Sequence, residues 1–169
     1  MLSSRSALLA VQPMQASDLP AILAIQRLCY PAHLIEPAAA LQSRRQRAPG
    51  HCWVARRGGQ VLGYLFSHPW QRASLPKLGQ DLPALPPAPD CLFLHDLAVH
   101  PDGRGQKVAE QLLHASYRPA RAAGLRHGRL VAVEGADAFW ARHGYRRQSE
   151  AASGLCGYGE QAVLMDCLL

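Results

Sequence analysis

The stretch CLFLHDLAVHPDGRGQKVAEQ, residues 91–111, decides the fold of this chain. Its first half is mostly apolar and has the length of a strand, and Pro101-Asp102-Gly103 then interrupts the extended chain. Beyond this turn, the apolar residues between Val108 and Leu113 recur at helical spacing, so a helix is expected from residue 105 or 106. The sequence therefore predicts a buried strand that ends near His100, followed closely by the first turn of a helix.

The start of that helix is a candidate anion site. A first helical turn carries N–H groups without intrahelical partners and the positive end of the helix dipole. Gly105 has no side chain, so a ligand can approach the backbone closely there. These features suit a phosphate or pyrophosphate group.

These residues resemble the acetyl-CoA-binding signature of the GNAT superfamily of N-acetyltransferases, which has the form (Arg/Gln)-x-x-Gly-x-(Gly/Ala). Arg104 occupies the first position and Ala109 the last, but Lys107 stands where the central Gly is expected. The preceding strand and the later segment AFWARHGY, residues 138–145, strengthen the resemblance.

The resemblance implies acetyl-CoA as cosubstrate, with no metal. The pantetheine amides would pair with the backbone of the strand, which would also face the thioester carbonyl, and the pyrophosphate would lie on the turn and the helix start. The implied cofactor-binding residues are Leu97, Ala98, Val99, Arg104, Gly105, Gln106, Lys107, Val108, Ala109, Glu110 and Trp140.

Length and charge set broad limits. A chain of 169 residues is the size of one domain, so residues 1–169 are expected to form a single domain, which the resemblance implies is an acetyltransferase domain. The formal net charge of +6 favours anionic partners. The basic residues are scattered, however, and the short cluster Arg44-Arg45-Gln46-Arg47 is interpreted as a solvated helix face, so no nucleic-acid partner is expected.

Cysteine usage and hydropathy point to a cytoplasmic protein. Five cysteines are an odd number, and they show no Cys-x-x-Cys or metal-ligand spacing, so they are interpreted as reduced thiols. No segment approaches the ~20 apolar residues that a membrane helix needs, so no membrane partner is expected. A homodimer is left open.

Periodicity and turn signals predict the order of elements. Gly58-Gly59 is a hairpin signal, and Pro119 is expected to kink or end its helix after Arg118. Strands are expected at 8–13, 52–56, 61–68, 91 to about 100, 129–133, 145 to about 150 and 161–168, and helices at 17–29, 37–47, 105 to 118 and 136–142.

This order gives an α/β (α+β) chain with a mixed sheet and helices on both faces. The resemblance implies the GNAT fold, which has a mostly antiparallel seven-stranded sheet. In that fold, strands four and five are parallel and splay apart to admit the pantetheine.

His95 is the candidate catalytic base. An amine is protonated near neutral pH, and a histidine with its ordinary pKa of about 6.5 is mostly neutral there and can take a proton. Strand alternation predicts that His95 and Asp96 lie on opposite faces, which argues against a simple dyad. LHDLAVH most resembles the arylalkylamine N-acetyltransferases, in which a histidine at this position helps deprotonate the amine through water and a second lies two residues earlier; Phe93 stands there in this chain.

The acceptor is expected between the segment 30–36 and the proline-rich loop 69–89, whose six prolines exclude an interior strand or a long helix. Trp70 is a candidate to pack the body of the amine, and Glu36 or Asp81 to attract its charge. The predicted substrate-binding residues are Tyr30, Glu36, Trp70 and Phe93.

Many GNAT enzymes carry a Tyr at the position of Trp140, where its phenol protonates the departing thiolate. An indole N–H is not a usable acid, which leaves water, Tyr145 or Tyr158 for that task. We expect an acetyl-CoA-dependent N-acetyltransferase acting on a small primary amine, which the arylalkylamine likeness would make aromatic. A non-catalytic acyl-CoA sensor and a protein N-acetyltransferase are the alternatives.

Overall fold

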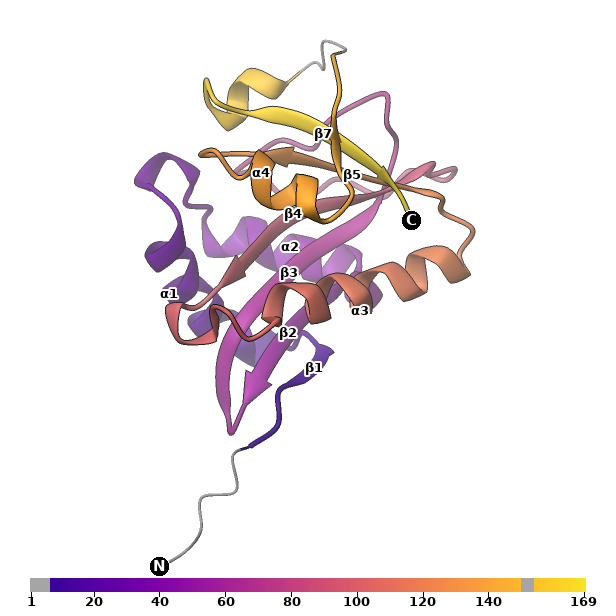
Figure 1. Cartoon of the computed structure of the whole chain (residues 1–169). Helices are drawn as coiled ribbons and strands as arrows, with labels where there is room; N and C mark the ends of the chain where they lie inside the picture. The colour runs from indigo at the N-terminus through magenta and orange to yellow at the C-terminus, as the bar shows by residue number, and fades with distance from the viewer. Residues whose placement is uncertain (1–6, 150–153) are drawn as a thin grey trace, which may run out of the picture.

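The computed structural model describes residues 7–149 and 154–169 and contains one seven-stranded sheet (Figure 1). The strand order is β1-β2-β3-β4-β5-β7-β6. The strands are β1 (Ala10–Pro13), β2 (Cys52–Arg57), β3 (Gln60–Trp70), β4 (Cys91–Val99), β5 (His127–Ala132), β6 (Arg146–Arg147) and β7 (Val163–Leu168). The helices are α1 (Leu19–Cys29), α2 (Ala38–Arg47), α3 (Val108–Ala122) and α4 (Asp137–Arg142). Short 3₁₀ turns are η1 (Ala16–Asp18), η2 (Ala32–Leu34), η3 (Pro49–His51), η4 (Pro101–Gly103) and η5 (Leu155–Tyr158).

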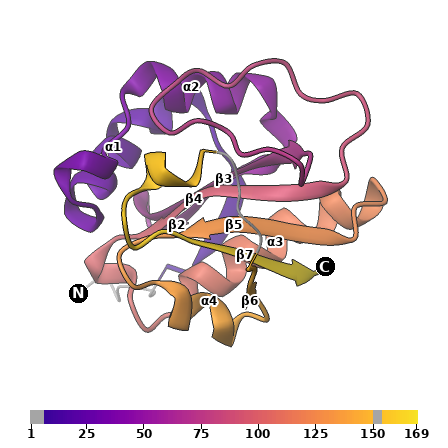
Figure 2. The ribbon, with the colours of Figure 1, turned by 90° about the horizontal axis from the view of Figure 1, so that it is seen from above.

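The sheet is antiparallel except at its centre. β4 and β5 pair in parallel, whereas the other neighbouring strands run antiparallel. α1 and α2 cover one face of the sheet, and α3 and α4 lie on the other (Figures 1 and 2). The expected fold class, a mixed and mostly antiparallel sheet with helices on both faces, is confirmed.

Each face has its own apolar core. Ile22, Ile25 and Leu41 pack against β2 and β3 on the α1/α2 face. On the opposite face, α3 approaches β3 closely at Gly63, where an added Cβ would lie 2.8 Å from Val108 Cγ1. The absence of a side chain at Gly63 therefore sets how near the start of α3 lies to the sheet.

Two elements extend past prolines that were expected to stop them. α3 continues through Pro119 to Ala122, because a proline removes only one helical hydrogen bond and the buried Ala120 and Leu125 anchor the last turn in a cluster with Leu92. Of the two outcomes expected at Pro119, a kink or an end of the helix after Arg118, the end is wrong, because α3 runs on to Ala122.

β3 likewise continues to Trp70, with Pro69 opposite Leu92. β2 pairs with β3 only as far as Phe66, so Pro69 lies where a strand flanks β3 on one side alone, a position that tolerates a missing N–H. The proline-rich loop therefore begins after Trp70 and not at Pro69. At the other end of the sheet, β6 is shorter than predicted, and residue 150 lies outside the described residues.

No helix in the described ranges is both long enough and apolar enough to cross a membrane. Within the same ranges, no three His, Cys, Asp or Glu side chains gather in a way that would hold a metal ion.

Candidate functional site

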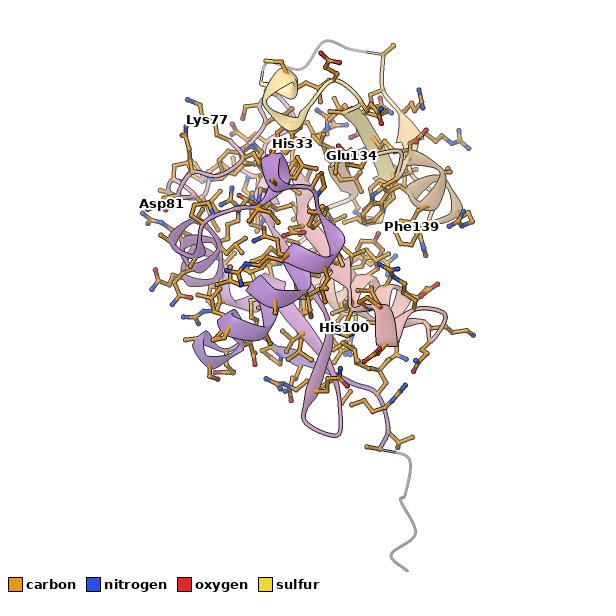
Figure 3. All side chains as sticks on the ribbon, turned by 90° about the vertical axis from the view of Figure 1, so that its left-hand side faces the viewer. His33, Lys77, Asp81, His100, Glu134 and Phe139 are labelled. Carbon is orange, nitrogen blue, oxygen red and sulfur yellow. The ribbon has the colours of Figure 1, made fainter. Side chains whose placement is uncertain are left out.

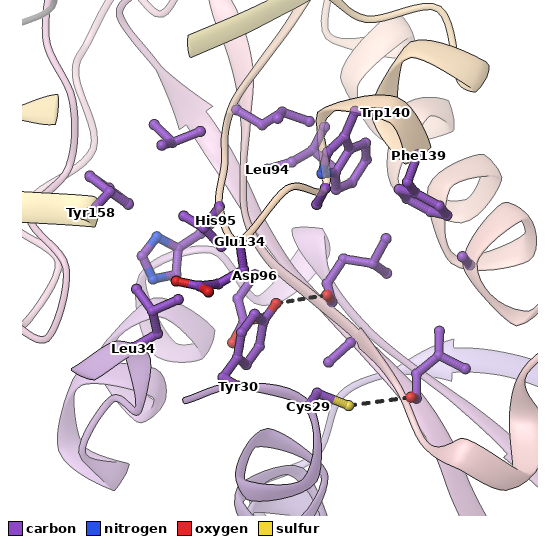
Figure 4. Close-up of a pocket in the computed structure, with 18 of the residues that line it drawn as sticks. Cys29, Tyr30, Leu34, Leu94, His95, Asp96, Glu134, Phe139, Trp140 and Tyr158 are labelled. Carbon is purple, nitrogen blue, oxygen red and sulfur yellow. Dashed lines mark hydrogen bonds between the residues drawn. The ribbon is translucent and has the colours of Figure 1, made fainter. Parts of the chain in front are cut away.

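The parallel pair at the centre of the sheet opens into a pocket. β4 and β5 pair only from Leu92 to Leu94, opposite Gly128 to Leu130. Beyond this point a pocket of about 350 Å³ lies between the two strands, and β4 lines it from Leu94 to Val99. In Figure 4, Phe139 and Trp140 border the pocket from α4, whereas Leu34 and Tyr158 border it on the other side.

The open edge of β4 presents backbone groups to this pocket. The His100 N–H donates to the carbonyl of Leu62, which fixes the alternation of the antiparallel ladder with β3. Leu97 and Val99 therefore direct their N–H and C=O groups away from β3. The Tyr30 hydroxyl lies 2.9 Å from the carbonyl oxygen of Leu97, and the Cys29 thiol lies 3.3 Å from that of Val99.

A β-bulge at His95 changes which side chains share a face. Phe66 pairs with Asp96 and Ser67 with Leu94, so His95 is an extra residue without a partner in the ladder. As a result, His95 and Asp96 both point to the α1/α2 face. The prediction that strand alternation separates these two side chains is wrong, because the bulge shifts the alternation by one residue.

His95 is held by Glu36. Its Nε2 atom lies 2.6 Å from Oε1 of Glu36, and the two side chains are 0% and 2% exposed. Burial lowers the pKa of His95, although the Glu36 charge opposes the shift. Nδ1 of His95 is buried and has no hydrogen-bond partner in the described part of the chain. A neutral His95 that donates from Nε2 therefore carries its lone pair on Nδ1.

Glu36 is the centre of a buried polar group. Its Oε2 atom accepts the Gly79 N–H at 2.8 Å and lies 3.7 Å from a guanidinium nitrogen of Arg44. Its backbone N–H and C=O both bond the side chain of Gln26. Burial acts to raise the pKa of Glu36, but His95 and Arg44 outweigh it and hold this pKa below its usual value. Glu36 is therefore ionised at neutral pH.

Asp96 lies between two tyrosines. Oδ1 accepts the Tyr30 hydroxyl at 2.8 Å, and Oδ2 accepts the Tyr64 hydroxyl at 2.9 Å. Burial, with the nearby Glu36 charge second, raises the pKa of Asp96 to about 7 although both phenols oppose the shift. The bulge thus places a carboxyl group that titrates near neutrality beside the pocket.

The turn between β4 and α3 has two residues in the left-handed region. Gly105 has φ +73°, and nothing lies within 4 Å of where its Cβ would stand. Lys107 has φ +60°, a conformation that costs about 1–2 kcal/mol for a residue with a Cβ. α3 begins at Val108, two or three residues later than predicted, because this turn is not helical. Arg104 and Ala109 both line the pocket.

Comparison with known proteins fits this geometry. The sequence profile of the Acetyltransferase (GNAT) family matches residues 19–145. The chain belongs to the GNAT family. A search of curated protein sequences gives no match.

Solved GNAT structures resemble the chain over nearly its whole length. The loading GNATL domain of CurA from Lyngbya majuscula is 13% identical, with a TM-score of 0.80, and the match covers 95% of this chain and 98% of that one. The GphF GNAT-like decarboxylase, solved in complex with isobutyryl-CoA, is 19% identical with a TM-score of 0.75 and coverage of 94% and 98%. The ribosomal-protein-S18-alanine N-acetyltransferase from Escherichia coli is 15% identical with a TM-score of 0.67 and coverage of 95% and 94%. At these identities the likeness shows the fold alone, and it does not support the expected placement in the arylalkylamine branch.

The residues that the GNAT signature marks for the cofactor fall into two groups. Those lining the pocket are Leu97, Ala98, Val99, Arg104, Ala109 and Trp140, and those that form the neighbouring turn and helix start without lining it are Gly105, Gln106, Lys107, Val108 and Glu110. Trp140 packs edge-on against Phe139, which also lines the pocket.

Two of the four predicted acceptor-binding residues lie at the pocket, and the other two lie elsewhere. Tyr30 and Glu36 line the pocket. Trp70 and Phe93 instead pack with Leu82 and Cys91 in a separate buried cluster. Asp81 is exposed on the outer surface, away from His33 and Glu134 (Figure 3).

The two tyrosines considered as thiolate acids also differ in position. Tyr145 is buried, does not line the pocket, and bonds the Tyr117 hydroxyl at 2.9 Å. Tyr158 lines the pocket and donates its hydroxyl hydrogen bond to the carbonyl of Pro76.

Arg44 was not identified by sequence reasoning. The basic cluster 44–47 predicts a solvated helix face, but Arg44 is 1% exposed. Its guanidinium donates to the carbonyls of Gln80 and Lys77, at 2.9 and 3.0 Å, and so fixes the proline-rich loop against α2. Leu78 of this loop forms part of the pocket wall. A helix with three arginines gives no sequence signal that one of them is buried.

Proposed function

We propose that this chain is an acetyl-CoA-dependent N-acetyltransferase that transfers the acetyl group to a small primary amine by direct attack on the thioester. The observation that carries this proposal is the open edge of β4. It runs from the anion-binding turn before α3 to a group of carboxylates at the other side of the pocket.

The turn and the open edge suit acetyl-CoA. The Leu97 and Val99 N–H groups face the pocket, where they offer hydrogen bonds to the pantetheine amides or to the oxygen of the thioester carbonyl. The Gly105 backbone, which no neighbouring atom covers, and the N-terminus of α3 offer N–H hydrogen bonds to the pyrophosphate. The acyl-CoA bound by the GphF decarboxylase supports a cosubstrate of this class.

The charges lining the pocket favour an amine. Three acidic side chains, those of Glu36, Asp96 and Glu134, line it against the single guanidinium of Arg104, and Asp96, with a pKa of about 7, carries only part of a charge at neutral pH. Arg104 lies beside the anion-binding turn, so the remainder of the pocket is acidic. A protonated amine is attracted to such a surface, whereas an anionic acceptor is repelled.

The pocket walls favour a small acceptor. Tyr158 donates to the carbonyl of Pro76 in the proline-rich loop, and Arg44 donates to the carbonyl of Lys77 in the same loop. His33 Nε2 lies 3.3 Å from Oε1 of Glu134, which lines the pocket (Figure 3). These contacts hold segments of the chain in place around the acceptor side of the pocket. We therefore favour a small amine over a protein chain.

His95 is the proposed base, and Glu36 orients it. Glu36 accepts the Nε2–H, which leaves the lone pair on Nδ1 free to receive the amine proton directly or through water. Both oxygens of Glu36 are engaged, one by the Gly79 N–H and the other by His95. Its proposed role is therefore to orient His95, in place of the expected attraction of the amine charge.

In the proposed reaction, the protonated amine first gives one proton to His95, and the neutral amine then attacks the thioester carbonyl. The nitrogen loses its second proton to solvent as the amide forms. The N–H groups of Leu97 and Val99 donate to the oxygen that becomes negatively charged. The carbon–sulfur bond then breaks and the CoA thiolate leaves.

The direct experiment is an amine panel that follows CoA release, with thermal stabilisation by acetyl-CoA measured alongside. We expect stabilisation by acetyl-CoA and release of CoA with at least one small amine. Stabilisation without turnover of any small amine or protein substrate would instead support a non-catalytic acyl-CoA sensor, the second candidate, which the indole at Trp140 favours. Turnover of peptides alone would favour a protein N-acetyltransferase.

A further inference from the structure

The hydroxyl of Tyr30 has two acceptors and one proton. Tyr30 is the C-terminal cap of α1, and its oxygen lies 2.8 Å from Asp96 Oδ1 and 2.9 Å from the carbonyl oxygen of Leu97. Both distances are those of good O–H···O hydrogen bonds. A phenol can donate to only one acceptor at full strength.

The protonation state of Asp96 decides whether both acceptors near the Tyr30 hydroxyl can be hydrogen-bonded at once. If Asp96 is ionised, Tyr30 donates to Asp96 or to Leu97, and the other acceptor is left without this donor. If Asp96 is protonated at Oδ1, it donates to the Tyr30 oxygen, and Tyr30 donates to Leu97. All three groups are then joined in one directed chain, while Oδ2 still accepts from Tyr64.

The chain leads from a buried carboxyl group to the open edge of β4. Tyr30 lines the pocket, and the carbonyl of Leu97 belongs to the segment that the proposed function places against the thioester. Tyr64 bonds the same carboxyl group but is 0% exposed and does not line the pocket. Only one of the two tyrosines can therefore reach a substrate.

We propose that Tyr30 is the acid that protonates the departing CoA thiolate, and that Asp96 is a positioning residue that supplies its proton. This inference rests on the proposed acetyl transfer. It provides the acid that Trp140 cannot provide.

The step is balanced in protons and electrons. The carbon–sulfur bond breaks and its electron pair stays on sulfur. The Tyr30 O–H bond breaks as its proton moves to sulfur, and the Asp96 proton moves to the Tyr30 oxygen. The carboxylate that remains regains a proton from solvent before the next turnover.

The titration of the two groups explains why they work as a pair. Burial, followed by the Asp96 charge, raises the pKa of Tyr30 well above its usual value, so the phenol alone is a poor acid. Asp96, with a pKa of about 7, is partly protonated at neutral pH and can replace the proton at once. The titratable and charged groups around Asp96 are Cys29 and Tyr30 of α1, Glu36, Arg44 of α2, Tyr64 of β3 and His95 of β4.

A matched pair of variants tests the role of Tyr30. Tyr30→Phe and Tyr64→Phe each remove one hydroxyl that bonds Asp96, and thermal unfolding of each variant is measured to check that it is folded. We expect Tyr30→Phe to lower kcat by roughly 10²-fold, in the range of a general acid, whereas Tyr64→Phe stays within a few-fold at low pH. Equal kcat in wild type and Tyr30→Phe would overturn the proposal.

The pH profile separates a proton source from a merely structural contact. Wild-type kcat should fall as pH rises past about 7, as Asp96 loses its proton. Tyr64→Phe removes a hydrogen bond that stabilises ionised Asp96, so the fall in kcat should move to higher pH. Asp96→Asn should have a reduced kcat that does not fall in this pH range. If kcat falls at the same pH in both variants as in the wild type, Asp96 is not the source of the proton.

A measurement on the free protein does not require turnover. The infrared carbonyl band of a protonated carboxyl group should titrate near neutral pH, be absent in Asp96→Asn and persist to higher pH in Tyr64→Phe. Absence of such a band in the wild type at pH 6 would overturn the role of Asp96. A wild type that releases no CoA with any amine would refute the proposed function itself, whereas an active wild type with an equally active Tyr30→Phe would refute only this inference.

Discussion

Nε2 of His95 lies 2.6 Å from Oε1 of Glu36, and neither side chain is exposed by more than 2%. The two residues are far apart in the sequence and are brought together by β4 and the segment before α2. A buried carboxylate that accepts one imidazole N–H fixes the tautomer and the orientation of the ring. This relationship makes Nδ1, and not Nε2, the atom from which base catalysis is expected.

His95→Gln should lower kcat/KM by about 10²-fold or more, because glutamine keeps a hydrogen bond to Glu36 but cannot take the proton. Acetyl-CoA affinity and melting temperature should change little. The ratio of wild-type to variant rates should approach one as pH rises towards about 10, since the amine is then already neutral. A folded variant whose deficit does not vary with pH would contradict the base assignment.

Arg44→Gln should destabilise the protein by about 3–5 kcal/mol, because it leaves Glu36 buried without its cation and releases the carbonyls of Lys77 and Gln80. Arg47→Gln, on the exposed side of the same helix, is the control and should change stability by less than about 0.5 kcal/mol. Urea unfolding of both variants measures the difference. Equal stabilities would mean that Arg44 does not hold the loop.

The variants Gly105→Asp and Gly105→Asn test the effect of a negative charge at the proposed phosphate site. The two side chains have nearly the same shape, and both tolerate φ +73° better than other residues do. Asp should abolish thermal stabilisation by CoA, whereas Asn should weaken it less, because only Asp repels the pyrophosphate. Identical CoA affinities in the two variants would remove the phosphate-loop assignment.

Lys107→Gly should raise stability by roughly 0.5–1 kcal/mol, because glycine adopts the left-handed conformation without the Cβ penalty but loses more backbone entropy on folding. CoA affinity should stay within a few-fold, since the backbone N–H remains. Lys107→Ala is the control, because it removes the charge and retains the strained conformation. A gain of stability in the alanine variant would trace the effect to charge.

The stability of the wild type should fall relative to that of Asp96→Asn between about pH 5 and pH 7. The folded pKa of Asp96 is about 7, above its usual value of 3.8, so the folded state binds more protons than the unfolded state across this window. Stability contributed by the protonated carboxyl is therefore lost as pH rises, by at most about 1.4 kcal/mol per pH unit. Urea unfolding at several pH values, taken as the difference between the two proteins, measures this slope. A difference that does not change between pH 5 and pH 7 would show that Asp96 is ionised throughout this window.

The fold could be predicted because its signals are local. The Gly58-Gly59 hairpin, the turn at Pro101–Gly103 and the apolar runs on either side each act over a few residues. The errors at Pro69 and Pro119 share one cause, since neighbouring strands and buried side chains decide whether a proline ends an element.

The site could be predicted only in part, because its contacts join distant segments. The sequence identifies Glu36 and His95 as candidates but gives no sign that they bond each other. Trp70 and Phe93 have the right chemistry for an amine pocket, and packing against Leu82 directs them elsewhere. The bulge depends on the register between β3 and β4, which no alternation of apolar residues within β4 can reveal.

Because of the bulge, the pairing of β3 with β4 does not depend on the residue that supplies the proposed base. Leu94 pairs with Ser67 and Asp96 with Phe66, and these two partners are adjacent in β3. A chain lacking only residue 95 could therefore keep every pair of the β3–β4 ladder, with regular alternation restored. Deletion of a single codon could therefore remove this histidine without repacking either core. Insertion of a single codon into a regular ladder could supply it in the same way.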